Sequence, residues 1–361
     1  MVTGSSGFLG QHVIRVLQEK THGLKEIRAF DLKAYENNLG KAAQIICHTE
    51  YIPVKSCTGD IRNQDDVKRA LRGVDAVVHS AGVISFGTFP DIDTMADVNI
   101  NGTHNLIDCC VEQGVTRLVH TSTVDVVIGY EPITDGDESL QVPPKFLFTG
   151  YPISKYHSEK LVLGANGKLL ENRGNFKQLS TVALRPNVMY GELDPYYVTN
   201  GLKSASNQGG TLPRVGNGRA LFQQAYAGNV AWAHVLALHQ LGQPGGELAS
   251  GHAFFIPDDT PLMNSFAFME PFLKARGFSL STVSIPYPLM YAVFYVTELF
   301  LKIVKPIHKI SLDANLASLI YINMDVYFKR SKAEQLLGYK PIYSYDESLK
   351  KSMEYYKTVE L

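Results

Sequence analysis

The chain has 361 residues, of which 45% are hydrophobic and 19% are charged, and its formal net charge is −1. This length suits one large domain or two modest ones with a sizeable core. The near-zero charge, without a long run of Lys or Arg, argues against general nucleic-acid binding, which depends on many phosphate contacts. The N-terminus lacks the charged-then-apolar pattern of a signal peptide, so any membrane targeting is expected to be internal.

In chain order, the first half alternates between predicted strands and helices. Apolar runs predict strands at 1–3, 27–30, 51–57, 75–79, 117–121 and 181–185. Helical spacing of apolar residues predicts helices at 11–20, 65–72, 92–113 and 152–164. Such alternation is typical of a parallel sheet with helices on both faces, so we predict an α/β, Rossmann-type doubly wound fold.

The second half is less regular, because glycines and prolines interrupt residues 191–218. Helices are predicted at 229–241, 262–276, 331–338 and 345–356, and an apolar segment spans 285–304. We expect residues 1–186 to form a cofactor-binding core to which parts of 220–260 return. Residues 187–361 are then expected to form a smaller substrate-binding region.

A glycine pattern joins the first predicted strand to the first predicted helix. Gly4, Gly7 and Gly10 form G-x-x-G-x-x-G, which lets the backbone approach a pyrophosphate at a helix N-terminus. Asp31 ends the second strand, 21 residues past Gly10, where a carboxylate accepts ribose hydroxyls and repels a 2′-phosphate. The sequence therefore predicts NAD rather than NADP as the cofactor.

Further cofactor contacts are predicted around this loop and after the next strand. Asp60 is expected either beside the adenine or as the N-cap of the following helix. The remaining predicted contacts in these segments are Phe8, Leu9 and Ile61. Only three residues precede Gly4, whereas a strand usually has about five, so we expect a short strand or a natural chain that starts earlier.

The catalytic prediction rests on a Y-x-x-x-K pattern at the start of a predicted helix. Tyr151 and Lys155 share one helix face, and an ammonium beside the phenol is expected to lower the pKa of the tyrosine toward neutrality. Such a phenolate could take the proton of an alcohol while hydride leaves the same carbon. Tyr156 and Lys160 have the same spacing, but Tyr151 is preferred because it begins the helix. At the end of the fifth strand, the Ser/Thr triplet 121–123 offers hydroxyls that could hold the substrate oxygen.

Several motifs together resemble the extended short-chain dehydrogenase/reductase superfamily. They are TGSSGFLG, Asp31, HSAG at 79–82, VNINGT at 98–103, Tyr151–Lys155 and LRP at 184–186. More narrowly, VNINGT, ALRPNVMYGE, AGNVAWAHVLAL and IPDDTP resemble the 3β-hydroxysteroid dehydrogenase/Δ5-4 isomerase family, along nearly the whole chain. The resemblance implies NAD-dependent oxidation of a 3β-hydroxy steroid or sterol to the 3-oxo product.

The resemblance also assigns roles to individual residues. It implies that Tyr151 is the general base, that Lys155 activates it, and that Thr123 holds the substrate oxygen where the family usually has serine, with Ser122 as the alternative. It places Ala81 and Gly82 beneath the nicotinamide ribose and Pro186 near the nicotinamide ring. It also places Asn99 at a distortion of a helix beside the site.

One departure from the family concerns the isomerase half of its activity. Where the family tends to have two tyrosines before an aspartate pair, this chain has FFIPDD at 254–259. A candidate acid is therefore missing, although Asp258 could act as the base. Isomerisation is accordingly a weaker expectation than dehydrogenation.

The apolar segment 287–307 is expected to associate with a membrane. Its uninterrupted apolar run has only eight residues, and the polar and aromatic side chains Tyr291, Tyr295, Glu298, Lys302 and Lys305 form one stripe. This pattern favours a helix in the membrane interface over a spanning helix, with a buried helix covering the substrate pocket as the alternative. The resemblance implies the endoplasmic reticulum or mitochondrial membrane, with the protein facing the cytosol.

Other expectations concern thiols, metals, partners and rival functions. Reduced thiols are expected because no CxxC pair occurs, and no metal site is predicted. The cysteines are Cys47, Cys57, Cys109 and Cys110. Helices 92–113 and 152–164 could form a homodimer interface or simply pack on their own sheet. The rival functions are a decarboxylating sterol-4α-carboxylate 3-dehydrogenase and a non-catalytic, NAD-binding membrane scaffold.

Overall fold

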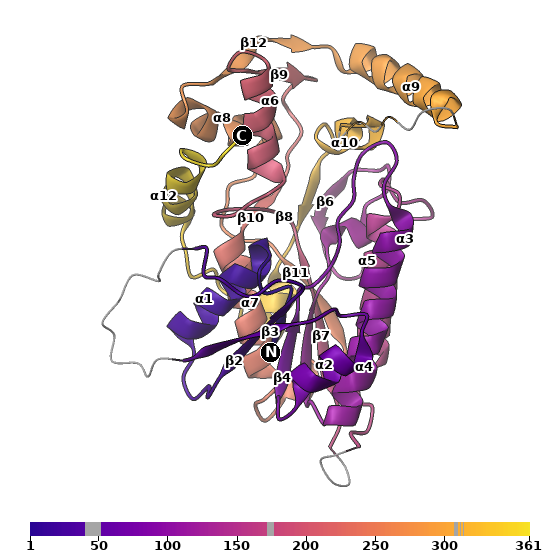
Figure 1. The fold of residues 1–361 in the computed structure, drawn as a ribbon. Coiled ribbons are helices and arrows are strands. Elements are labelled where there is room, and N and C mark those ends of the chain that lie inside the picture. The colour runs from indigo at the N-terminus through magenta and orange to yellow at the C-terminus, as the bar shows by residue number, and fades with distance from the viewer. Residues whose placement is uncertain (40–51, 172–176, 307–309, 311, 313) are drawn as a thin grey trace.

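A seven-stranded, wholly parallel sheet forms the centre of the protein (Figure 1). The computed structural model describes residues 1–39, 52–171, 177–306, 310, 312 and 314–361. In spatial order the strands are β11 (His252–Ile256), β7 (Ser180–Pro186), β5 (Arg117–Thr121), β4 (Ala76–His79), β1 (Val2–Thr3), β2 (Ile27–Asp31) and β3 (Val54–Thr58). The chain order reverses between β1 and β4, which is the switch point where ligands bind in such sheets. The predicted Rossmann-type fold is thus confirmed.

The central strand β1 has only two residues. Val2 pairs with Ala29 and Val78 on its two sides, and Thr3 is 0% exposed. The strand ends at Gly4, so the glycine loop starts directly at the carboxyl edge of the sheet.

Helices cover both faces of the sheet because their apolar stripes pack on its Val- and Leu-rich strands. One face carries α1 (Phe8–Lys20), α7 (Ala227–Gln240) and α11 (Ser331–Leu337). The other face carries α2 (Gln64–Leu71), α4 (Gly102–Gln113) and α5 (Tyr151–Gly164). Within the chain, α4 and α5 also pack on each other. That these two helices form a homodimer interface stays a prediction.

The predicted helix 92–113 is present, and a wider turn distorts it around Asn99. α3 (Ile92–Met95) runs into the π-helical turn η1 (Ala96–Asn101) before α4 begins. The Asn99 carboxamide accepts from Val83 N at 2.7 Å, and it donates to Val83 O and to Ser154 Oγ at 2.9 Å each. This buried side chain ties the loop after β4 to α5, and it lies at the distortion that the resemblance implies.

Smaller elements form the second region above the carboxyl edge of the sheet (Figure 1). Its strands pair in parallel as β8 (Val188–Tyr190) with β10 (Gln224–Tyr226), β9 (Thr211–Val215) with β12 (Ser279–Ile285), and β6 (Ile133–Gly136) with β13 (Val326–Phe328). Its helices and short turns are α6 (Tyr197–Asn207), α8 (Ser265–Ala275), α10 (Leu316–Tyr321), α12 (Tyr345–Tyr356) and η2 (Val124–Val127), whereas η3 (Gly246–Leu248) precedes the amino end of β11. Buried aromatic rings, among them Tyr190, Phe268 and Phe272, hold much of this region together.

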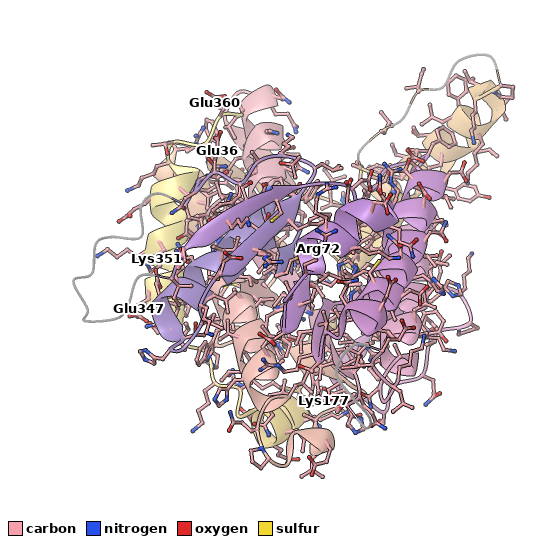
Figure 2. The ribbon with its side chains drawn as sticks, turned by 60° about the horizontal axis from the view of Figure 1, so that its bottom comes forward. Glu36, Arg72, Lys177, Glu347, Lys351 and Glu360 are labelled. Atoms are coloured by element: carbon pink, nitrogen blue, oxygen red, sulfur yellow. The ribbon has the colours of Figure 1, made fainter. Side chains whose placement is uncertain are left out.

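One helix, α9 (Tyr287–Val304), projects from the body of the protein (Figures 1 and 2). Its 18 residues have a mean hydropathy of 1.3. By length and composition alone, the helix is long and apolar enough to cross a membrane. Leu301 is the buried residue of α9, and the residues that line the cavity described below include none from this helix. The alternative of a buried helix over the substrate pocket is therefore wrong.

The chain has nearly equal numbers of basic and acidic residues, 34 Lys and Arg against 35 Asp and Glu. Figure 2 labels examples of both signs: Glu36, Arg72, Lys177, Glu347, Lys351 and Glu360. Among the cysteines, Cys57, Cys109 and Cys110 are free thiols, and Cys47 lies outside the described residues.

Candidate active site

A cavity of about 560 Å³ opens at the carboxyl edge of the central strands. It brings together all of the predicted cofactor and catalytic residues except Asp258. These are Gly4, Gly7, Phe8, Leu9, Gly10, Asp31, Asp60, Ile61, Ala81, Gly82, Ser122, Thr123, Tyr151, Lys155 and Pro186. They meet because the carboxyl ends of parallel strands lie at one edge of a sheet.

The glycine loop has the geometry that a dinucleotide requires. Gly4 has φ +67°, and a Cβ there would lie 2.7 Å from Ala81 N, while a Cβ on Gly10 would lie 2.1 Å from Gly4 O. α1 begins after Gly7 without a side-chain cap, so its first N–H groups face the cavity. Asp31 Oδ2 accepts from Ser6 N at 2.9 Å, which holds the carboxylate beside the loop. These residues fit the pyrophosphate and adenosine ribose of NAD.

Asp60 lines the same cavity but does not cap a helix. Its carboxylate forms an ion pair with Arg62 at 2.6 Å, and hydrogen bonds from Arg62 hold the pKa of Asp60 below its usual value. Asn63 is the N-cap of α2, since its side chain accepts from Asp65 N and Asp66 N. The capping alternative for Asp60 is therefore wrong.

Tyr151 is the first residue of α5, and its ring packs against the ring of Phe86 with 5.5 Å between the centroids. Burial, and secondly the charge of Asp125, raise the pKa of Tyr151, while a hydrogen bond with Thr123 opposes this shift. The prediction that the pKa of Tyr151 is lowered toward neutrality is therefore wrong.

Lys155 lies one turn further along α5, among buried histidines. Its Nζ is 3.4 Å from His120 Nε2, and burial lowers the pKa of Lys155 to about 8, against the charge of Glu159. His120 also contacts Ser158 Oγ at 3.2 Å, and its ring lies 5.1 Å from that of His79. Burial penalises the charged form of each group, and it is the largest cause of the pKa shifts of both Tyr151 and Lys155.

The two candidate hydroxyls after β5 have different surroundings. Ser122 Oγ donates to Glu159 Oε2 at 2.6 Å, and Glu159 is itself paired with Arg185. Thr123 Oγ1 instead donates to Asp125 Oδ2 at 3.1 Å and lies beside Tyr151. Thr123 is thus the better placed of the two to hold a substrate oxygen.

The second Y-x-x-x-K pair does not belong to the site. The Nζ of Lys160 lies 5.3 Å from the centroid of the Tyr156 ring, so the pair packs as a cation over an aromatic face. Neither residue lines the cavity. Within the described ranges, no group of three or more His, Cys, Asp or Glu is arranged to hold a metal ion.

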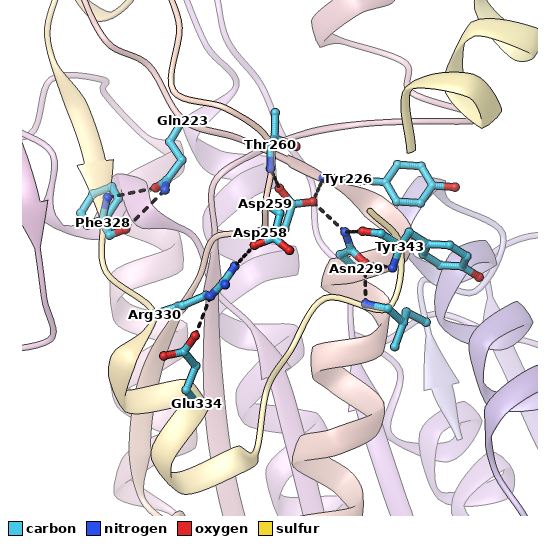
Figure 3. A network of polar contacts seen from close by, with 11 residues as sticks. Gln223, Tyr226, Asn229, Asp258, Asp259, Thr260, Phe328, Arg330, Glu334 and Tyr343 are labelled. Carbon is cyan, nitrogen blue, oxygen red and sulfur yellow. Dashed lines mark hydrogen bonds and ion pairs between the residues drawn. The ribbon is translucent and has the colours of Figure 1, made fainter. Parts of the chain in front are cut away.

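Asp258 lies away from the cavity, in a polar network of its own (Figure 3). Its Oδ2 accepts from Tyr226 N at 2.8 Å and from Asn229 Nδ2 at 2.9 Å, and its Oδ1 accepts from Thr260 N at 2.9 Å. These bonds fix the start of α7 against the end of β11. The assignment of Asp258 as an isomerase base is therefore corrected to a structural role.

Two residues of the site were missed by the sequence reasoning. Asp125 lines the cavity two positions after Thr123, and Phe86 covers Tyr151 from the loop after β4. The hydroxyl-x-carboxyl spacing of Thr123 and Asp125, directly after a strand of the sheet, was the available signal for Asp125. No pattern in the sequence points to Phe86.

Comparisons with known proteins agree with this geometry. The family model described as "3-beta hydroxysteroid dehydrogenase/isomerase family" matches residues 1–288. A crystal structure of gox2253 aligns with a TM-score of 0.69 at 22% identity, covering 99% of this chain and 97% of that one. The dTDP-glucose 4,6-dehydratase DesIV from Streptomyces venezuelae, with NAD bound, aligns at 0.64 and 23% over 99% and 96%. The UDP-glucose 4-epimerase of Thermus thermophilus, also with NAD, aligns at 0.63 and 18% over 99% of each chain. At these identities the solved structures show the shared fold.

Proposed function

Because the chain belongs to the 3-beta hydroxysteroid dehydrogenase/isomerase family, we propose that it oxidises the 3β-hydroxyl of a steroid or sterol, with NAD as the cofactor. Family membership supports an NAD-dependent oxidoreductase. The observation that carries the proposal is that one cavity unites the glycine loop and Asp31 with Tyr151, Lys155 and Thr123. Dinucleotide binding and alcohol chemistry thus share one site.

The residues that line the cavity would have separate roles in binding the cofactor and in the reaction. The N–H groups at the start of α1 would hold the pyrophosphate, and Asp31 would accept the adenosine ribose hydroxyls. NAD, when bound, supplies the acceptor for the hydride of the oxidised carbon. Thr123 would position the substrate oxygen, Tyr151 would take its proton, and Lys155 would offer an amine to the nicotinamide ribose.

For Δ5-to-Δ4 isomerisation the proposal assigns no residue. Asp258, the candidate that the resemblance supplied, is fully engaged by three N–H donors. The ultraviolet absorbance of the product distinguishes the Δ5- from the Δ4-3-oxo steroid, because only the Δ4-3-oxo steroid contains a conjugated enone.

We also propose that α9 lies against a membrane, because the apolar and polar faces of this helix point in different directions. Leu289, Val293, Val296, Phe300 and Ile303 recur at helical spacing and are all exposed. An exposed apolar face of this length fits the interface of a lipid bilayer.

Two members of the polar stripe, Glu298 and Lys305, contact the rest of the protein. Glu298 Oε1 accepts from Leu316 N at 2.7 Å, and Lys305 Nζ lies 4.8 Å from the centroid of the Phe89 ring. Asn315 Nδ2 donates to Gly87 O at 2.9 Å. The helix is thereby fixed beside the loop that covers Tyr151, which supports entry of a sterol from lipid. By its resemblance, the membrane is that of the endoplasmic reticulum or the mitochondrion.

The test is a screen for NADH formation with the purified full-length protein. The panel contains 3β-hydroxy-Δ5 steroids, bile-acid precursors, 4-carboxysterols and UDP-glucose. Turnover of a 3β-hydroxy steroid is expected, and release of carbon dioxide from a 4-carboxysterol would instead identify the decarboxylating dehydrogenase. NAD binding without turnover on the whole panel would contradict the proposal and favour the scaffold.

A further inference from the structure

The carboxyl groups in the cavity wall differ in what surrounds them. Among the described residues, the carboxyl groups that line the cavity are those of Asp31, Asp60, Asp125 and Asp194. Asp31 accepts from the glycine loop, and Asp60 forms an ion pair. Asp194 accepts from backbone N–H groups at the start of α6. Asp125 is the carboxyl group that contacts Thr123, the residue proposed to hold the substrate oxygen.

The Asp125 carboxylate is buried without a counter-charge. It is on turn η2, directly after β5, and the residue is 8% exposed. Its Oδ2 accepts from Thr123 Oγ1 at 3.1 Å, and its Oδ1 accepts from Tyr321 Oη at 3.3 Å. Among the ion pairs of the described residues, none involves this carboxylate. Because each carboxylate oxygen has two lone pairs, either oxygen can take up a proton while it keeps its partner.

This position is next to the carbons that flank the oxidised carbon. In the proposed function, Thr123 holds the oxygen on C3, and an O–H···O hydrogen bond is about 2.8 Å long. Asp125 Oδ2 lies 3.1 Å from the same Thr123 oxygen. Since C4 is bonded to C3, the carboxylate lies within reach of C4. Once C3 is a ketone, the carbonyl group acidifies the hydrogens on C4, and a carboxylate beside them can act as a base.

We propose that Asp125 is the base and the acid of Δ5-to-Δ4 isomerisation, and that it moves a proton from C4 to C6 of the 3-oxo steroid. The inference rests on the dehydrogenase function proposed above, and it supplies a residue for the step left unassigned there. The C4–H bond breaks and its proton forms an O–H bond on Asp125. The freed electron pair makes the C3=C4 double bond, while the carbonyl pair moves to the oxygen.

The second half of the step returns the same proton. The C3=O bond forms again, the C3=C4 pair moves to C4=C5, and the C5=C6 pair takes the proton of Asp125 to make a C6–H bond. Asp125 is then ionised as before, and no oxidant or reductant is used. One carboxyl group suffices, because C4 and C6 are both bonded to C5.

The groups around Asp125 suit this exchange. Burial raises the pKa of Asp125 to about 6, against hydrogen bonds from Thr123 and Tyr321, so the carboxylate is ionised at neutral pH but is a stronger base than an exposed one. The titratable groups that face it are the phenols Tyr151 of α5 and Tyr321 of α10, with Tyr197 of α6 close to Tyr321. Burial raises the pKa of Tyr151, so its phenol keeps a proton to donate to the oxygen of the dienolate.

The test measures the two reactions separately. Isomerisation is followed as enone absorbance formed from the Δ5-3-oxo derivative of pregnenolone with NADH present, and oxidation is followed as NADH formed from pregnenolone. The carboxamide of Asp125→Asn still accepts a hydrogen bond but cannot carry the proton. Its isomerisation rate is expected to fall at least about a hundredfold, and at least about ten times more than its oxidation rate. Equal losses of both rates would overturn the assignment.

A matched variant and a pH profile complete the test. Asp258→Asn changes the other candidate carboxyl group in the same way, and its ratio of isomerisation to oxidation should remain that of the wild type. A ratio that falls in Asp258→Asn instead would overturn the inference. In the wild type, isomerisation should lose rate as the pH falls through about 6, because the base becomes protonated. The residual rate of Asp125→Asn should lack this loss, and a wild-type rate without it contradicts the assignment.

The wild-type protein distinguishes this inference from the function on which it rests. Formation of NADH from pregnenolone without isomerisation of the Δ5-3-oxo steroid would overturn the inference alone. Failure to oxidise any 3β-hydroxy steroid would refute the proposed function, while the isomerisation assay would still test Asp125.

Discussion

Glu159 and Arg185 form a buried ion pair directly beneath the candidate active site, with 2.6 Å between Glu159 Oε1 and Arg185 Nη2. Glu159 comes from α5 and Arg185 from β7, and Ser122 of the loop after β5 donates to the same carboxylate. The guanidinium carbon of Arg185 also lies 5.3 Å from the centroid of the Phe255 ring on β11. Helix α5 and the strands β5, β7 and β11 are thus joined through this ion pair.

Replacing Glu159 with Gln should therefore destabilise the fold, because it leaves a buried arginine without its counter-charge. The expected loss is about 3 kcal/mol of unfolding free energy, measured by urea titration. The control is Glu270→Gln, which breaks the exposed Glu270–Lys274 pair of α8 and should cost less than about 1 kcal/mol. Equal effects of the two variants would show that the buried pair does not hold the site together.

Cofactor choice should depend on Asp31. Asp31→Ser removes the carboxylate that would accept the ribose hydroxyls and repel a 2′-phosphate, so NAD affinity should fall by about ten- to a hundredfold. The preference for NAD over NADP should shrink in the same variant. Isothermal titration with each dinucleotide measures both, and an unchanged preference would show that Asp31 does not read the ribose.

Asp125→Asn should make the protein more stable at neutral pH, because it replaces a buried carboxyl group that ionises with one that stays neutral. The folded-state pKa of Asp125 is raised from 3.8 to about 6, so the ionised group destabilises the fold above that pH. This penalty is absent well below pH 3.8, where the carboxyl is protonated in both states, and it develops as the pH rises from 3.8 to about 6.

The size of this effect follows from a shift of roughly two pKa units, which corresponds to about 3 kcal/mol at most. Thermal unfolding of the wild type and of Asp125→Asn at pH 4 and pH 7.5 tests it. The variant should melt higher at pH 7.5 and nearly together with the wild type at pH 4. A variant that melts lower at both values would contradict the buried-carboxylate account.

The apolar face of α9 should carry membrane binding. Changing Val296, Phe300 and Ile303 together to Ser removes three exposed apolar side chains, and liposome affinity should fall at least about a hundredfold. Flotation with vesicles of phosphatidylcholine and phosphatidylserine measures this. Leu248→Ser, at an exposed site on turn η3, is the matched control and should float like the wild type. Undiminished flotation of the triple variant would refute a membrane role for α9.

The cofactor side of the site was predictable because its geometry is local. Gly4 to Gly10, Asp31 and Tyr151 lie at or next to strand and helix ends, and the parallel topology brings such ends to one edge. The start of α5 at Tyr151 could likewise be placed, since Pro152 is favoured in the first turn of a helix.

What could not be predicted depends on contacts between segments that are far apart in sequence. The Tyr321–Asp125 bond spans 196 residues, and the break at Asn99 depends on Val83 and Ser154. The IPDD motif pointed to Asp258 as a candidate base. Only the packing of β11 against α7 shows that the Asp258 carboxylate accepts hydrogen bonds from a backbone N–H and from the Asn229 amide. The Tyr151 pKa depends on burial, which helix spacing alone does not report.

The most direct test of the account is the comparison of Tyr151→Phe with the wild type. NAD binding is measured by titration calorimetry, and turnover is measured as NADH formation from a 3β-hydroxy steroid. The phenylalanine ring fills the same space but cannot carry a proton, so turnover should fall by about a thousandfold or more while NAD affinity is unchanged. Turnover that survives this change would contradict the claim that the phenol of Tyr151 transfers the proton of the substrate.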